Sequence, residues 1–93
     1  MKDRESFYKK LKEQLDDTTK FPSDYLYKFI VAADGDRVDQ IQNIFNNKGA
    51  VITTKKSKTG KYISVSIVVK LSSSDEVIQY YKQAEKIEGI ISL

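Results

Sequence analysis

The residues with the clearest chemical potential lie in SKTGKYISVSIVVK, residues 57–70, where lysines, a glycine and a tyrosine precede two spaced serines. The Gly60-Lys61 pair invites comparison with a phosphate-binding loop. That motif has a glycine five residues before its Gly-Lys pair and Ser or Thr directly after the lysine, and it joins a strand to a helix. Here Lys55 takes the glycine position, Tyr62 follows the lysine, and strands are predicted on both sides. We therefore reject a phosphate-binding loop.

Other catalytic chemistry is limited by the residue types present. The chain has no histidine and no cysteine, which removes thiol nucleophiles, zinc and iron–sulfur centres and histidine-dependent triads. The acidic pairs Asp34/Asp36 and Asp75/Glu76 stand where helices are predicted to begin, so capping and the helix dipole account for them. No carboxylate cluster has the spacing of a calcium loop. We expect no enzyme activity, no cofactor and no metal site.

The totals indicate a small soluble protein. A chain of 93 residues is expected to form one domain. Its net charge of +3 is only mildly basic and does not by itself indicate a nucleic-acid partner. No apolar run approaches the roughly 18–20 residues of a membrane helix, and no apolar segment follows the N-terminal charges. We expect a cytoplasmic protein without a membrane segment.

An amphipathic helix is predicted over residues 3–17, because Phe7, Leu11 and Leu15 recur at every fourth position. The apolar stripe is narrow, so this helix must dock on another surface to be stable. A proline then follows Phe21 and favours an extended backbone there, so we expect the folded core to begin at Phe21. This divides the chain into an N-terminal helix with its linker, residues 1–20, and a domain, residues 21–93.

Six elements are predicted in that domain from β-branched alternation and helical spacing. They are strands over residues 25–33, 50–56, 62–71 and 90–93, a helix over residues 36–48, and a helix between Ser73 and Gly89. The resulting order is β-α-β-β-α-β. Two right-handed crossovers joined by a hairpin give an α+β ferredoxin-like plait, in which an antiparallel sheet carries two helices on one face.

The alternation also predicts what lies on each face of the sheet. Val65 and Ile67 are expected to lie under the helices, with Ser64 and Ser66 on the opposite face. A purely solvated face is expected to carry more charge, so we predict that a partner or the N-terminal helix covers this side. The candidate interaction surface comprises Lys28, Ser57, Lys58, Gly60, Lys61, Tyr62, Ser64 and Ser66.

A nucleic-acid interface is the main alternative, because RNA-binding plaits stack bases on aromatic residues of the third strand. Tyr62 lies in about the right place, but Ser64 takes the second stacking position, and the first strand presents Leu26 and Lys28. The Lys55–Lys61 hairpin has the charge to contact phosphates, although lysines at a hairpin also discourage aggregation. We prefer a non-catalytic regulatory or interaction module and keep weak nucleic-acid binding as the alternative.

Three stretches support a more specific comparison: FPSDYLYKFIV, SKTGKYISVSIVV and the C-terminal IISL. In this order, they resemble the YbeD-like family of small bacterial proteins of unknown function. The resemblance covers Phe21–Leu93 and implies a ferredoxin-like fold close to the ACT regulatory domains, which bind small effectors and often pair. No activity is established for the family, so it supplies no catalytic residue. A protein partner, a second copy of the chain and a small effector all remain open.

Overall fold

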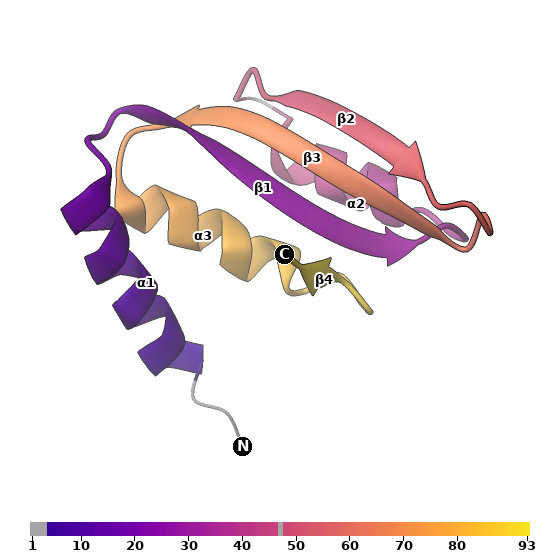
Figure 1. Ribbon diagram of the computed structural model, residues 1–93, viewed down its shortest axis with the longest axis horizontal. Coiled ribbons are helices and arrows are strands. Elements are labelled where there is room, and N and C mark those ends of the chain that lie inside the picture. The colour runs from indigo at the N-terminus through magenta and orange to yellow at the C-terminus, as the bar shows by residue number, and fades with distance from the viewer. Residues whose placement is uncertain (1–3, 47) are drawn as a thin grey trace.

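The computed structural model describes residues 4–46 and 48–93. Its elements are α1 (Arg4–Thr18), β1 (Ser23–Ala32), α2 (Arg37–Ile44), β2 (Val51–Lys56), β3 (Tyr62–Leu71), α3 (Ser74–Ala84) and β4 (Ile91–Ser92). The strands form one sheet in the order β2-β3-β1-β4, and all neighbouring strands are antiparallel. This is the predicted ferredoxin-like plait with an added N-terminal helix (Figure 1).

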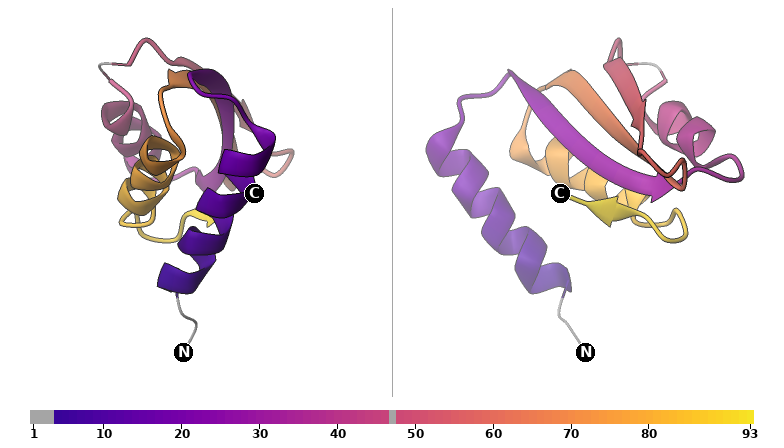
Figure 2. Two further views of the ribbon diagram at one scale, coloured as in Figure 1. Left: turned by 90° about the vertical axis from the view of Figure 1, so that its left-hand side faces the viewer. Right: turned by 45° about the vertical axis from the view of Figure 1, so that its right-hand side comes forward.

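The core lies between the sheet and the helices α2 and α3 (Figure 2). Tyr27, Phe29 and Val31 of β1 are at most 1% exposed, whereas Leu26 and Lys28 on the opposite face are exposed and Ile30 is half-buried. β3 alternates in the same way and buries Val65, Ile67, Val69 and Leu71. The predicted assignment of residues to the two faces is therefore confirmed for both long strands.

The turn between β2 and β3 is tight and internally bonded. The backbone N–H of Gly60 donates to the carbonyl of Ser57 at 3.0 Å, and the N–H of Ser57 donates to the carbonyl of Tyr62 at 2.8 Å. Gly60 has φ +76°, a left-handed conformation that glycine adopts without strain. β2 and β3 are thus adjacent strands of a hairpin, as predicted.

The start of α3 is capped by a side chain, but not by a full capping box. The Ser73 side chain accepts the N–H of Glu76 at 3.2 Å. The Glu76 carboxylate does not return to the Ser73 backbone as in a capping box. It accepts the Ser72 N–H at 2.8 Å and lies 2.8 Å from Lys48 Nζ. The cap therefore also ties α3 to the segment after α2.

The helix α2 is shorter than the predicted 36–48, running over Arg37–Ile44. Asp36 occupies the position before the helix, but its side chain makes no capping hydrogen bond, so that part of the prediction is wrong. The Asp36 backbone is not extended, and its carboxylate instead accepts a hydrogen bond from Gln40 Nε2 at 2.8 Å. Asn47 lies outside the described residues.

The helix α1 packs beside α3 and does not cover the outer face of the sheet (Figures 1 and 2). Tyr8 and Leu15 are buried, at 4% and 8% exposure, and Leu15 belongs to the main core cluster. Phe7 is 54% exposed, so its place in the predicted docking stripe is wrong; Tyr8 takes that role. Asp3, where the helix was predicted to begin, lies outside the described residues.

Polar contacts hold the C-terminal half of α1 against the start of α3. The Ser74 hydroxyl, which belongs to a buried residue, donates to Asp16 Oδ1 at 2.7 Å. Lys12 Nζ lies 3.3 Å from Asp75 Oδ1 and 3.2 Å from Ser74 Oγ. Among the described residues, no helix has the length and apolar content needed to cross a membrane.

Candidate functional site

The sheet face that points away from α2 and α3 carries the candidate site. The strand register places Leu26 of β1 opposite Val68 of β3, and Val68 opposite Val51 of β2. These three side chains are 52%, 41% and 64% exposed. An apolar row therefore crosses three strands without any element of the described chain covering it.

The next rows mix polar and apolar side chains. Lys28 lies opposite Ser66, which lies opposite Thr53. On the other side of Lys28, its carbonyl accepts the Leu93 N–H at 2.9 Å, so β1 is an inner strand at this point. The following row contains Ile91, Ile30, Ser64 and Lys55. The face thus has apolar side chains on all four strands, with lysines between them.

The predicted site residues separate into two groups. Lys28, Tyr62, Ser64 and Ser66 belong to β1 and β3 and lie in these rows or beside them. Ser57, Lys58, Gly60 and Lys61 form the turn beyond the end of β2. Gly60 has a structural role in that turn, while Ser57 and Lys58 meet Tyr62 and Ser64 around a hollow.

This hairpin hollow has a volume of about 250 Å³. Its walls are Ile30, Lys55, Lys56, Ser57, Lys58, Tyr62 and Ser64. The Ser57 hydroxyl accepts the Tyr62 N–H at 3.1 Å, and the Ser64 hydroxyl donates to the Lys55 carbonyl at 3.4 Å. Lys55 and Lys56 were predicted only as part of the Lys55–Lys61 hairpin of the nucleic-acid alternative. Ile30 was not among the predicted site residues, because only the strand register shows that it lies beside the hairpin.

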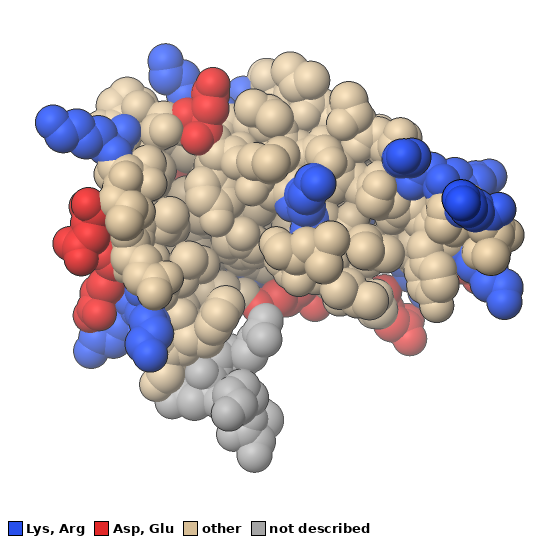
Figure 3. All heavy atoms as spheres, viewed as in Figure 1, with Lys and Arg blue, Asp and Glu red and all other residues tan. Residues whose placement is uncertain are grey.

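The charge around the hollow is of one sign. The sequence has no Asp or Glu between Asp39 and Asp75, and this stretch contains six lysines. Within the described residues, none of the lysines lining the hollow forms an ion pair, in contrast to Lys12, Lys48 and Lys82 on the helix side. Basic side chains gather at the right-hand end of Figure 3, where Figure 1 places the hairpin. This end of the face therefore carries a net positive charge.

The acidic side chains of the helix side serve structural contacts. The Lys48 ammonium and the Ser72 N–H lower the pKa of the Glu76 carboxyl, and the Ser74 hydroxyl lowers the pKa of Asp16. Burial raises the pKa of the Tyr27 and Tyr81 hydroxyls. None of these shifts moves a group toward neutrality, where general acid–base catalysis operates. The described residues also contain no cluster of three or more potential metal-binding side chains.

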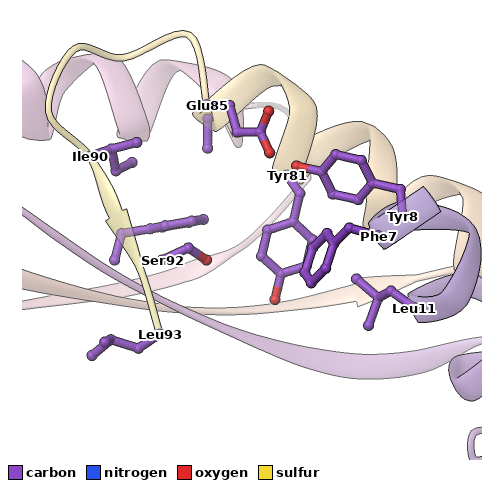
Figure 4. Close-up of a pocket in the computed structure, with 10 residues that line it drawn as sticks. Phe7, Tyr8, Leu11, Tyr81, Glu85, Ile90, Ser92 and Leu93 are labelled. Carbon is purple, nitrogen blue, oxygen red and sulfur yellow. The ribbon is translucent and has the colours of Figure 1, made fainter. Parts of the chain in front are cut away.

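A second hollow, of about 390 Å³, lies between α1 and the C-terminal strand (Figure 4). Its lining is mainly apolar and includes Phe7, Leu11 and Ile90. The Tyr81 hydroxyl in its wall lies 3.0 Å from the Tyr25 hydroxyl, so a partner within the chain satisfies it. The volume is within the range of small-molecule sites, but charged groups do not converge there as they do at the hairpin.

A family model described as "Protein of unknown function (DUF493)" matches residues 16–93. The chain belongs to the DUF493 family. This confirms the family predicted from the sequence. The DUF493 match spans all four strands and leaves most of α1 outside. No curated protein matches the chain.

Two solved structures share the fold of this DUF493 protein. The solution structure of HP0495 from H. pylori is 16% identical, covers 82% of this chain and 86% of its own, and has a TM-score of 0.64. The ACT domain of GTP pyrophosphokinase from Chlorobium tepidum is 13% identical, covers 76% of this chain and all of its own, and has a TM-score of 0.54. These likenesses establish an ACT-like plait.

Proposed function

We propose that this DUF493 protein is a non-catalytic interaction module, and that the outer face of its sheet docks a second protein with an apolar centre and an acidic rim. The exposed row of Leu26, Val68 and Val51 is the observation that carries the proposal. Exposed apolar side chains on one face are typical of interaction surfaces. Because α1 packs beside α3, the described chain itself leaves this row open.

The size of the face favours a transient contact. β1 and β3 each have ten residues and span roughly 33 Å, while β2 and β4 are shorter. With strands about 4.8 Å apart, the four strands give roughly 450 Å² in projection. A standard stable interface buries about 800 Å² on each partner. Docking therefore belongs among the weaker, regulatory encounters unless the partner also reaches the hairpin.

The charges of the face favour a different protein over a second copy. Lys28, Lys55 and Lys70 point outward from its strands, and Asp24 is the acidic residue of the same face. Two copies packed face to face would bring these lysines together, and like charges across an interface are costly. An acidic rim on the partner instead pairs with them.

The ACT-like fold supports a regulatory role by analogy, since the compared ACT domain is part of GTP pyrophosphokinase. A nucleic-acid role has less support. Tyr62 is the aromatic residue on the outer face of β1, β2 and β3, whereas single-strand readers stack successive bases on several aromatics. We expect at most weak, sequence-independent binding of oligonucleotides by the Lys55–Lys61 hairpin, abolished at physiological salt.

Site-specific photo-crosslinking in cells tests the proposal. A crosslinking amino acid at position 68 on the face is compared with one at position 79, where exposed Gln79 lies on α3. We expect position 68, but not position 79, to crosslink to a partner protein. Once purified, this partner should bind the purified DUF493 chain but not its Val68→Asp variant. Crosslinks from both positions, from neither, or only to a second copy would contradict the proposed partner.

A further inference from the structure

We propose that the hairpin hollow is the anchor of this interface and binds an aspartate or glutamate side chain of the partner, adjacent in its sequence to an apolar residue. The inference rests on the proposed function, because it names the chemistry of the same partner. It assigns a role to Lys55 and Lys58, which the apolar row alone does not explain.

The lining of the hollow combines the two properties that such a segment needs. Lys55, Lys56 and Lys58 supply positive charge from β2 and the turn, and they have no ion-pair partner among the described residues. Ile30 is half-buried and Tyr62 is 51% exposed, so both offer apolar surface beside those charges. A carboxylate side chain would pair with the lysines, and an apolar residue next to it in the partner would pack on Ile30 and Tyr62.

The turn offers few of the groups that phosphate sites in loops use. Phosphate sites in loops commonly use free backbone N–H groups and the planar fork of arginine. Here the N–H groups of Ser57, Gly60 and Tyr62 are all bonded within the turn. The hollow contains no arginine among its described lining residues. Its cationic groups are lysine ammonium groups, which act as point charges toward carboxylate and phosphate alike. The preference for a carboxylate side chain therefore rests on the apolar surface of Ile30 and Tyr62 beside these charges.

The strand pairing places the hairpin hollow next to the apolar rows of the outer face. Ser64 and Ile30 at its edge share a row with Ile91 of β4, and the row of Val68 and Leu26 lies further along the same strands. A segment anchored at the hairpin can therefore lay apolar side chains across the sheet. This predicts a partner segment with acidic residues at one end and aliphatic or aromatic residues toward the other.

Synthetic peptides test this anchor directly. The probe is a fluorescein-labelled peptide of alternating glutamate and leucine, and a peptide of alternating lysine and leucine serves as its control. Amide chemical shifts of the ¹⁵N-labelled chain report where each probe binds. We expect the glutamate peptide to shift the hairpin and the strand ends around Ile30 and Ser64. Its affinity should fall as salt rises, because screening weakens exposed charge contacts.

Matched charge variants give the decisive comparison. The double variant Lys55→Ala with Lys58→Ala should bind the glutamate peptide with about tenfold lower affinity, as expected for the loss of two exposed charge pairs. Lys9→Ala with Lys10→Ala removes the same charge from exposed positions on α1 and should leave binding unchanged. Equal losses in both variants, shifts elsewhere on the chain, or no binding would overturn the anchor. Tighter binding of inorganic phosphate or an oligonucleotide at the same amides would also overturn it.

The crosslinked partner separates this inference from the proposed function. If the lysine variant binds the partner as well as the unchanged chain does, while Val68→Asp does not, the sheet face docks a protein and the hairpin is not its anchor. If neither variant weakens binding, the docking face and the anchor are both wrong.

Discussion

Adjacent valines on β3 offer the sharpest test of the two-faced sheet. Val68 is 41% exposed on the outer face, and Val69 is 2% exposed in the core. Replacing each with aspartate makes the same chemical change in neighbouring positions of one strand. Any difference between the variants therefore reports which face the side chain occupies.

The expected costs differ severalfold. Val69→Asp loses about 1.5–2 kcal/mol of burial and places an unpaired carboxyl in the core at a cost of several more. The total of about 4–6 kcal/mol is comparable with the roughly 5–14 kcal/mol expected for a domain of this size. Val68→Asp loses partial burial and strand propensity, about 1 kcal/mol. Val69→Asp should therefore be strongly destabilised, whereas Val68→Asp should fold with most of the original stability.

Urea unfolding followed by circular dichroism measures these costs, and partner binding is then measured on the variant that folds. We expect Val68→Asp to unfold cooperatively at a slightly lower urea concentration and to lose partner binding, because it places a charge in the middle of the apolar row. Equal destabilisation by the two substitutions would refute the assignment of faces. A folded Val68→Asp variant with unchanged binding would remove the row from the interface.

Three further predictions concern stability. Removal of residues 1–19 should leave a domain that melts cooperatively, about 3–5 kcal/mol less stable because Tyr8 and Leu15 are lost from the packing; loss of the cooperative transition would make α1 essential to the core. Ser73→Ala removes the acceptor of the Glu76 N–H and should lower the free energy of unfolding by about 1 kcal/mol in urea, and an unchanged midpoint would contradict this capping role. The folded state lowers the pKa of Glu76 below its ordinary 4.5, so its stabilisation is present above that pH and is lost as the pH falls through the lowered value. In the Glu76→Gln variant, the urea midpoint should change less between neutral and acidic pH than it does in the unchanged chain. If the midpoint changes with pH as much in the variant, Glu76 is not the source of the pH dependence.

Much of the fold could be predicted because its signals are local. Alternation along β1 and β3 is enough to assign their buried and exposed residues, and Ser73 marks the start of α3. The position of α1 could not be derived in this way. Its stripe shows that it docks but not where, and the contact of Asp16 with Ser74 links residues far apart in sequence. Tyr8, next to the expected Phe7, is the buried aromatic because packing against α3 sets the rotation of the helix.

The candidate site is only partly visible in the sequence for a related reason. Lysines, Tyr62 and the serines share one stretch, so the hairpin is apparent from local sequence. The row of Leu26, Val68 and Val51 depends on the registers of two strand pairs, and a shift of one residue would send each side chain to the other face. The apolar row and the hollow beside Ile30 therefore follow from strand pairing, which local patterns do not specify.

The lysines of the face have a simpler explanation that accounts for only some of them. Edge strands often carry lysine because charge discourages pairing with other chains, and Lys55 and Lys56 lie on β2, an edge of the sheet. Lys28 lies on β1, where β3 pairs along one side and the Leu93 N–H bonds to its carbonyl on the other. No edge needs protection there. Edge protection therefore does not account for Lys28, and under the proposed function this lysine contacts an acidic group of the partner bound across the sheet.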